Sequence, residues 1–278
     1  MVVLVPELGA PAVVLLTVLT AGALLTIYYA DVDRRFLLQL FAAALLLRVL
    51  LGTITYCLNL QEFFGGDAAT YDGLGISLLQ VWRGELRYGV IAHTMAVRNF
   101  SGMPYLVAVL YAVVGRNMLA VQFFNAVIGA LTILPIYLSA QQIFENRRVA
   151  RATAVLIAFF PSMILWSSQG LKDAPIIFLL ALAMLATLRL CRKLSISYFL
   201  LLVGALLGLL SLRFYVFYMV GAAACGAFVI GQRRVTVRSF VQQMAIIICV
   251  GLALVQFGVL RSATIQYETF GSLEAIQR

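Results

Sequence analysis

The sequence predicts an all-α fold, a polytopic bundle of about eight transmembrane helices with juxtamembrane helices in a long first outer loop. Of its 278 residues, 63% are hydrophobic and only 11% are charged, whereas soluble domains contain about 25% charged residues. The mean hydropathy is +1.02. The net charge of +9 lies in short loops between apolar runs, which is typical of a membrane protein and excludes nucleic-acid binding.

Apolar runs of roughly the 20 residues that a membrane-spanning helix needs occur eight times along the chain. They cover residues 12–29, 36–58, 118–143, 150–167, 174–190, 197–211, 214–230 and 240–260. The run 103–114 is too short for a span, so we expect an interfacial or re-entrant helix there. No internal repeat or linker divides the sequence, which predicts one membrane domain over residues 1–278.

The positions of Lys and Arg predict the orientation, because cytoplasmic loops are enriched in these residues. If 103–114 does not cross, one side carries eleven basic and three acidic residues and the other carries eight of each. Counting 103–114 as a span would move three basic clusters outside. We therefore expect a multi-pass protein of the plasma membrane, the inner membrane of a bacterium, with both termini extracytoplasmic. The expected cytoplasmic clusters are Arg34/Arg35, Arg147/Arg148/Arg151, Arg189/Arg192/Lys193 and Arg233/Arg234/Arg238.

The long outer loop at 59–117 holds the largest group of acidic residues in the chain, namely Glu62, Asp67, Asp72 and Glu85. Long polar loops on a rigid scaffold often carry function. Asp67 opens a predicted surface helix on which Tyr71 follows one turn later on the same face. Its carboxylate suits a general base or a cation ligand. The commoner role of an acid here is to cap the helix N-terminus.

A second candidate lies in the next outer connection, where Lys172 precedes Asp173. Asp173 followed by Pro175 is a good helix start, which is a purely structural interpretation. The functional alternative is that Asp173 faces Asp67 across a cavity while Lys172 attracts a phosphate.

Two arginines are further candidates. Arg213 lies between two apolar runs beside aromatic residues, where it suits either a lipid phosphate or interfacial anchoring. Arg48 lies near the middle of the run 36–58, where a charge is costly without an internal partner. We expect it to form a structural ion pair or to line a hydrophilic cavity. His93, the single histidine, is expected to be an ordinary surface residue.

The order of these motifs is more informative than any one of them. An arginine-containing helix is followed by Gly66-Asp67-x-x-x-Tyr71, by Met103-Pro104-Tyr105 with a run ending at Gly115, and later by Leu171-Lys172-Asp173. This order resembles the protein mannosyltransferase and aminoarabinose transferase branch of the C-type (GT-C) glycosyltransferases. The resemblance covers roughly residues 36–215.

The resemblance implies an integral membrane transferase that moves a sugar from a polyprenyl-phosphate donor to an acceptor on the extracytoplasmic face, in the synthesis of a cell-envelope glycan. It implies that Asp67 is the catalytic acid–base residue and that Asp173 is the second acid. The substrate-binding candidates are then Tyr71, Lys172, Arg213, Arg116 and Arg48. No cofactor is assigned, although a divalent cation would fit the acids. The partners are the lipid-linked sugar and membrane lipid.

This sequence departs from the family pattern in two places. The Glu that often follows the loop Asp is Ala68, and an arginine common at the start of the next span is replaced by Gln122, with Arg116 near by. The segment 261–278 is too short for an outer soluble domain, so we expect acceptor recognition elsewhere, for example in a partner subunit.

Two other functions remain open, a catalytically inactive GT-C-like subunit or scaffold and a carrier of lipid-linked solutes. A transferase predicts that Asp67 and Asp173 converge near a basic residue. A scaffold predicts that both acids are merely helix caps. A carrier predicts inverted repeats or broken helices around a site at the membrane midplane.

Overall fold

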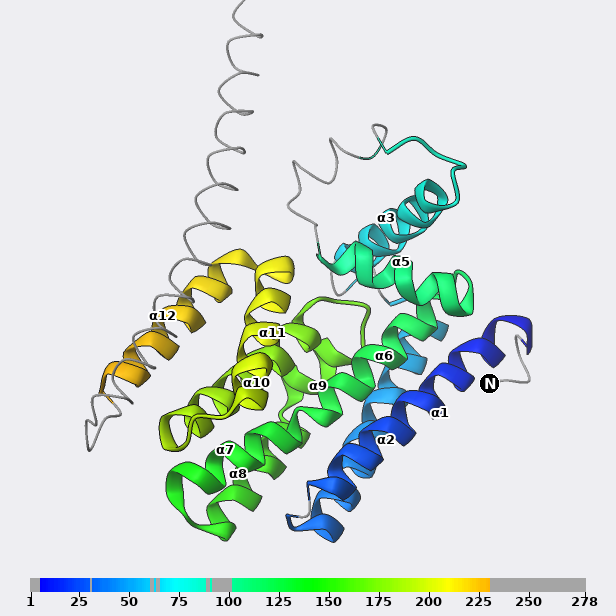
Figure 1. Ribbon diagram of the computed structural model, residues 1–278. Coiled ribbons are helices and arrows are strands. Elements are labelled where there is room, and N and C mark those ends of the chain that lie inside the picture. Colours follow the sequence, from blue (N-terminus) through cyan, green and yellow to red (C-terminus); the bar gives the residue numbers. More distant parts are fainter. Residues whose placement is uncertain are drawn as a thin grey trace, which may run out of the picture. The chain divides into compact units, whose positions relative to one another are not determined.

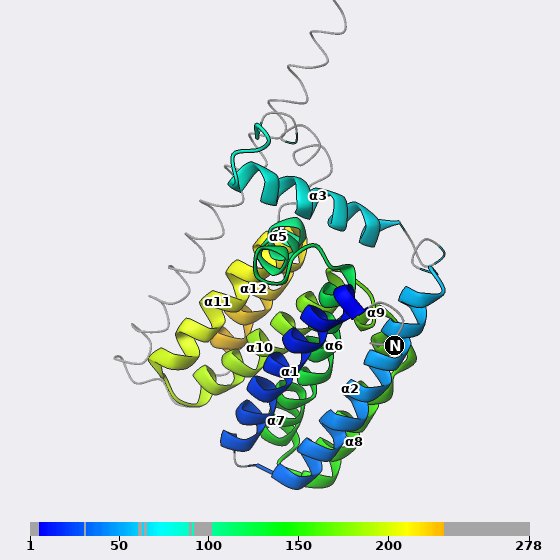
Figure 2. The same cartoon turned by 90° about the vertical axis from the view of Figure 1, so that its right-hand side faces the viewer.

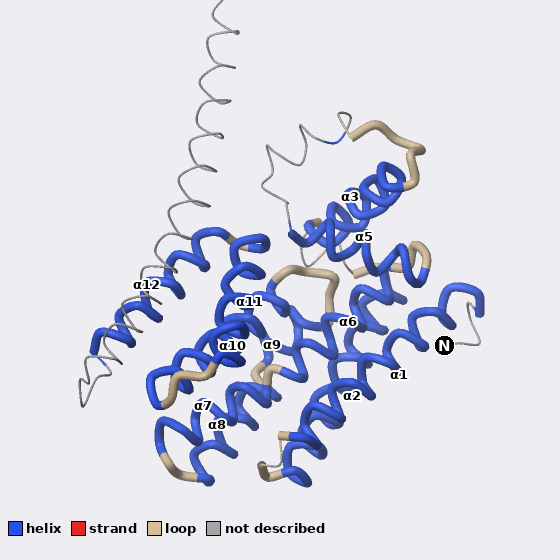
Figure 3. Tube along the Cα trace, in the orientation of Figure 1, coloured by secondary structure: helices blue, strands red, loops and turns tan. Residues whose placement is uncertain are grey.

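The structure is a computed structural model that describes residues 6–30, 32–60, 63, 66–88, 91 and 102–230. These residues form helices and short connections, and this part of the chain contains no strand (Figure 3). The predicted all-α fold is confirmed. The expected span 240–260, the basic cluster at 233–238 and His93 lie outside the described residues.

Contacts divide the chain into two compact units, Met1–Leu185 and Ala186–Arg278. The single domain expected from the sequence stays a prediction. The helices of the first unit, labelled in Figure 1, are α1 (Pro6–Tyr29), α2 (Arg34–Cys57), α3 (Asp67–Trp82), α5 (Gly102–Val114), α6 (Met118–Leu131), α7 (Ile133–Phe144), α8 (Arg147–Phe159) and α9 (Pro161–Ser167). Helix α10 (Asp173–Arg192) begins in the first unit and ends in the second, which also holds α11 (Ile196–Leu212) and α12 (Phe214–Ile230).

Four of the described helical segments are long and apolar enough to cross a membrane, and a fifth is added if α8 and α9 form one bent span. The four are Gly9–Tyr29, Arg34–Cys57, Met118–Phe144 and Asp173–Arg192. Helices α5, α11 and α12 are apolar but shorter. The short α5 fits the expectation for the run 103–114. The lengths and composition confirm a helical membrane protein.

Two of the apolar runs are interrupted where the sequence suggested continuous helices. The run 118–143 is divided into α6 and α7 at Thr132. The run 150–167 bends by 52° between α8 and α9. Pro161 begins α9, and a proline has no backbone N–H to continue the hydrogen bonds of the preceding helix, so the bend has a local cause.

Small residues allow the helices of the first unit to pack closely. Ala150, Ala154 and Ala158 recur every fourth residue on α8 and are fully buried. They belong to a core that includes Ala44 of α2 and Ala130 of α6. Helix α8 packs against α7, and both α1 and α2 pack against α6 (Figure 1). Apolar side chains gain little by leaving lipid for a protein interior, so such close backbone approach is what stabilises helices against each other in a membrane.

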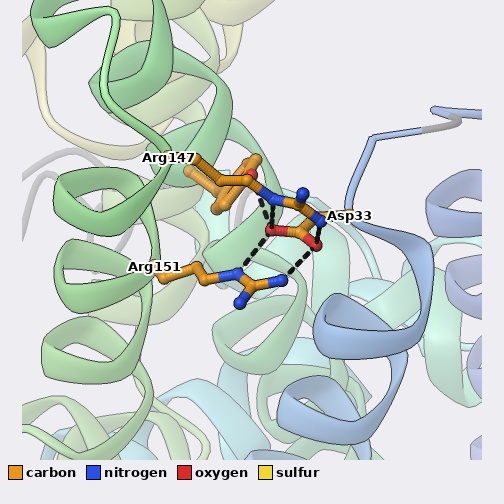
Figure 4. Close-up of polar contacts among 4 residues, drawn as sticks. Asp33, Arg147 and Arg151 are labelled. Atoms are coloured by element: carbon orange, nitrogen blue, oxygen red, sulfur yellow. Dashed lines mark hydrogen bonds and ion pairs between the residues drawn. The ribbon is translucent and has the colours of Figure 1, made fainter.

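At one end of this bundle, ion pairs join the loop between α1 and α2 to the start of α8. Asp33, between α1 and α2, accepts hydrogen bonds from Arg147 and Arg151, one turn apart on α8, and from the hydroxyl of Tyr137, 3.0 Å away (Figure 4). The Asp33 side chain is only 4% exposed. The hydrogen bonds from Arg147, and then those from Arg151, hold the pKa of the Asp33 carboxyl well below its usual range.

At the opposite end, α3 runs across the ends of the long helices instead of along them (Figure 2). It packs against α5. The approach is close because Gly75 of α3 faces Val107 of α5, and any larger residue would overlap the valine side chain. The long predicted outer loop therefore contains a helical pair that lies over one end of the bundle.

Candidate functional site

The first candidate residue, Asp67, lies at the start of α3. It is the first residue of the helix and is exposed. The N-cap position is Gly66, and no side-chain hydrogen bond caps the helix. Asp67 therefore does not act as the N-cap, although an acid at a helix start favours that role. The positive end of the helix dipole favours a carboxylate in the first turn, and the side chain remains available to other groups.

The second candidate pair, Lys172 and Asp173, lies where the connection 168–172 leads from α9 into α10. Although this connection is not helical, Ser168 and Gln169 are 0% exposed and Leu171 is 5% exposed. The side-chain amide of Asn125, on α6, donates hydrogen bonds of 2.6 Å to the backbone carbonyls of Gln169 and Leu171. Buried carbonyls outside a helix need such donors.

Two glycines make room for the same connection. A Cβ atom at Gly52 of α2 would lie 2.8 Å from the carbonyl oxygen of Ser168. A Cβ atom at Gly129 of α6 would lie 2.5 Å from Cβ of Ser167. The start of the connection therefore packs against α2, and the last residue of α9 packs against α6, at positions where only hydrogen atoms fit.

The connection and the first turns of α3 are neighbours. A methyl group added at Gly170 would lie 3.9 Å from Cβ of Ala68, the residue after Asp67. The ammonium of Lys172 lies 5.9 Å from the centre of the Tyr71 ring, within the range of a cation–π interaction. Tyr71 is itself 1% exposed. Lys172 is therefore brought close to the helix that Asp67 begins.

Asp173 is the first residue of α10 and is half-buried. Both acids therefore begin helices whose N-terminal surroundings touch each other, at the end of the first unit where α3 lies.

A third acid, Asp72, was not assigned to the site from the sequence. One of its oxygens accepts a hydrogen bond from the Tyr111 hydroxyl, and the other accepts one of 2.7 Å from Arg116. This interaction raises the pKa of Arg116. Burial, followed by the bond to Asp72, raises the pKa of Tyr111, so its hydroxyl stays protonated and can donate. Arg116 is 59% exposed and therefore presents the rest of its guanidinium to solvent or to a ligand.

Arg48 lies beneath the site at the bend between α8 and α9. It is 1% exposed and donates to the Ser167 hydroxyl at 2.9 Å and to the carbonyl oxygens of Ala44 and Ala158 at 3.0 and 2.9 Å. No ion pair to Arg48 occurs within the described part of the chain. It also borders a small cavity, whose lining includes Gly129, Thr132, Met163 and Trp166.

The neutral partners of Arg48 have a local origin. The carbonyl of Ile157, which lies 3.5 Å from the guanidinium, would bond in a continuous helix to the N–H of residue 161. That residue is Pro161, which has none. The arginine side chain therefore supplies donors to carbonyls that the bend releases, which is a structural reason for a charge at this depth.

Arg213 lies in the second unit, between α11 and α12. Its backbone N–H donates to the carbonyl of Leu209 at 2.7 Å, and its guanidinium lies 5.8 Å from the ring centre of Tyr215. This agrees with the expected aromatic surroundings and leaves its role as a phosphate-binding residue a prediction.

Residues 6–88 and 102–230, as far as they are described, contain no group of three or more His, Cys, Asp or Glu side chains arranged to hold a metal ion. A divalent cation at the acids stays a prediction.

Comparison with known proteins identifies the family. The model of the dolichyl-phosphate-mannose-protein mannosyltransferases matches residues 102–257, which is more than half of the 278 residues. The match includes Arg116, Lys172, Asp173 and Arg213, and it begins after Asp67. No curated protein and no solved structure matches significantly. The resemblance to C-type glycosyltransferases is confirmed, and with it a general assignment as a membrane glycosyltransferase. The chain belongs to the dolichyl-phosphate-mannose-protein mannosyltransferase family.

Proposed function

We propose that this protein transfers a sugar from a polyprenyl-phosphate donor to an acceptor at the extracytoplasmic face of the plasma membrane, which in a bacterium is the inner membrane. The observation that carries the proposal is the contact between the start of α3 and the connection before α10. It brings the surroundings of Asp67 and of the Lys172–Asp173 pair together, as the transferase interpretation predicts. A base, a second acid and a cation at a membrane surface are the groups that such a transfer needs.

The roles follow from the chemistry of the bond exchange. Asp67 takes the proton from an acceptor hydroxyl, whose oxygen forms a bond to the anomeric carbon of the sugar. The bond from that carbon to the lipid phosphate breaks, and the phosphate leaves with the bonding electrons. Lys172 stabilises the negative charge of the leaving phosphate, while Arg213 and Arg116 are further candidates for the same role. Asp173 orients Lys172 or the sugar.

The orientation is part of the proposal. Asp33, before α2, bonds to Arg147, the first residue of α8, at one end of the first unit. The charge distribution predicts that both residues are cytoplasmic. Asp67 and Lys172 are then on the extracytoplasmic side, where the polyprenyl-phosphate donor has to present its sugar.

The alternatives fit the geometry less well. A scaffold predicts that Asp67 serves as a helix cap, whereas Gly66 occupies that position. A carrier predicts a broken helix, and α8–α9 is one, but the carbonyls that the break releases are already bonded by Arg48.

The test is transfer of radiolabelled sugar from a panel of polyprenyl-phosphate donors by the purified protein in nanodiscs. Asp67→Asn keeps the size of the side chain and removes the base, and it is expected to lower the rate by about 100-fold or more while donor binding persists. Glu85→Gln is the matched control, because Glu85 is an exposed acid of the same loop.

Each outcome separates the candidate functions. Full activity of Asp67→Asn would remove Asp67 as the base. Donor binding without transfer by the unmodified protein, across the whole panel, would favour the scaffold or the carrier instead.

A further inference from the structure

Asn125 is a buried amide within the apolar span Met118–Phe144, and the transfer chemistry above gives it no role. It is 0% exposed. Polar side chains at such depth are costly and usually have a defined partner. Both partners of its amide nitrogen are backbone carbonyls of one connection, those of Gln169 and Leu171. Both N–H groups of this side chain thus donate to a single segment, residues 169–171.

That segment directly precedes Lys172 and Asp173. It also contains Gly170, at which an added Cβ would lie 3.9 Å from Cβ of Ala68 at the start of α3. A shift of these carbonyls would therefore move the lysine and the acid together, and would change their distance from Asp67. Because the connection is not helical, its buried carbonyls need hydrogen-bond donors from other elements.

The neighbouring amide Gln122 provides a contrast. It lies one turn earlier on α6 and is 1% exposed. Neither its side-chain nitrogen nor its side-chain oxygen has a hydrogen-bond partner among the described residues. The two buried amides on α6 therefore differ in their hydrogen bonds, since only the Asn125 nitrogen bonds to the connection.

We propose that Asn125 is a positioning residue that holds the connection 169–171 against the start of α3, and thereby sets the distance between the Lys172–Asp173 pair and Asp67. The positional part of this inference stands on the hydrogen bonds alone. Its effect on catalysis rests on the proposed function.

A disulfide between residues 68 and 170 measures that distance without any assay of activity. The two Cβ positions are 3.9 Å apart, within the roughly 3.5–4.5 Å that a disulfide allows. The experiment uses the full chain in nanodiscs, with its four cysteines replaced by serine and with Ala68→Cys and Gly170→Cys introduced. The rate of cross-link formation under a mild oxidant is then followed on denaturing gels.

Asn125→Leu keeps the volume and removes both donors, and we expect it to slow cross-linking by about tenfold or more, as the loss of two hydrogen bonds implies. Gln122→Leu is the control and should leave the rate unchanged. Asn125→Ser retains one donor and should give an intermediate rate of cross-linking. If Asn125→Leu does not fold, the rate of Asn125→Ser tests the positioning role instead. An unchanged rate in folded Asn125→Leu, or in Asn125→Ser where the leucine variant fails to fold, would overturn the proposal.

Transfer activity gives the second readout, measured with the native residues at 68 and 170. Asn125→Leu should lower kcat by about tenfold at a temperature at which both it and Gln122→Leu remain folded. Absence of transfer by the unmodified protein would refute the proposed function and leave the cross-linking result intact. A slower cross-link with unchanged kcat would refute the catalytic consequence of positioning.

Discussion

The side chain of Arg48 is buried among neutral oxygens, and this determines what its loss would do. In Arg48→Met, the carbonyls of Ala158 and Ile157 lose the donors that the guanidinium supplies. Each unsatisfied group costs about 1–3 kcal/mol, partly offset because a buried charge is removed as well. We expect a net loss of about 2 kcal/mol or more in stability, measured as thermal unfolding in detergent micelles.

The matched control for this change is Arg148→Met, which alters an exposed arginine of α8, the helix that ends at the bend. Such a surface change should shift stability by no more than about 0.5 kcal/mol. Equal stability of Arg48→Met and Arg148→Met would contradict the role of Arg48 at the bend.

Asp33 makes stability depend on pH. Its pKa is lowered in the folded protein, chiefly by the hydrogen bonds from Arg147. Its stabilising contribution is therefore complete above the ordinary carboxyl pKa of about 3.9 and is lost as the pH falls below that value towards the folded pKa. Asp33→Asn should unfold at a lower temperature than the unmodified protein at pH 7, and the difference should shrink below about pH 4.

Glu145→Gln serves as the comparison for Asp33→Asn, because Glu145 is an exposed acid of the neighbouring loop. At pH 7, Glu145→Gln should lower the unfolding temperature much less than Asp33→Asn does. A difference between Asp33→Asn and the unmodified protein that stays constant from pH 7 to pH 3 would show that the two arginines do not act through the ionised carboxylate.

At the scale of the helices, the connection before α10 depends on glycines at the surfaces that hold it. In Gly52→Ala, the new methyl group would lie 2.8 Å from the Ser168 carbonyl oxygen, and backbone atoms on both sides cannot yield easily. We expect the connection to move, with cross-linking between residues 68 and 170 slowed and thermal stability lowered by about 1–3 kcal/mol.

Gly22→Ala in α1 is the control for this prediction, because a methyl group there meets no atom within 4 Å. Alanine is the better helix former by about 1 kcal/mol, so the control should be neutral or slightly stabilising. A Gly52→Ala protein that matches this control would mean that the connection tolerates displacement.

The sequence predicted the elements better than it predicted their contacts. The start of α3 at Asp67 and of α10 at Asp173 followed from local signals, because acids and prolines favour the first helical turn. The contact between these starts did not, since it depends on Asn125 bonding residues 44 and 46 positions away. An amide within an apolar run signals an internal partner, but no periodicity identifies that partner.

The same limit applies to Asp72 and Arg48. Asp72 is one acid among several in a loop, and its bonds to Tyr111 and Arg116 come from outside its own helix. Arg48 was expected to form an ion pair or to line a hydrophilic cavity, but its partners in the described part of the chain are neutral. They include the carbonyls of Ile157 and Ala158 at the bend. The bend itself was within reach of the sequence, because a proline inside an apolar run is a recognised cause of a broken helix.

At the scale of the whole molecule, family membership and the site cover different parts of the chain. The matched region, residues 102–257, contains the Lys172–Asp173 pair and Asn125. Asp67 and Tyr71 precede it. The contact between α3 and the connection joins these two parts of the sequence, so the proposed chemistry depends on long-range packing as well as on the family motif.

Orientation in the membrane is the prediction that belongs to the molecule as a whole. The turn between α1 and α2, which carries Asp33, lies at the opposite end of the first unit from α3 (Figures 1 and 2). The two ends should therefore face opposite sides of the membrane. In a chain without native cysteines, a cysteine at exposed position 148 should react with an impermeant maleimide only after the cells are permeabilised. One at exposed position 85 should react in intact cells, because charge places it outside. Labelling of position 148 from outside would invert the topology and place Asp67 on the cytoplasmic side, away from the proposed acceptor. Labelling of both positions in intact cells would instead mean that the two ends share one side, and α2 would then not cross the membrane.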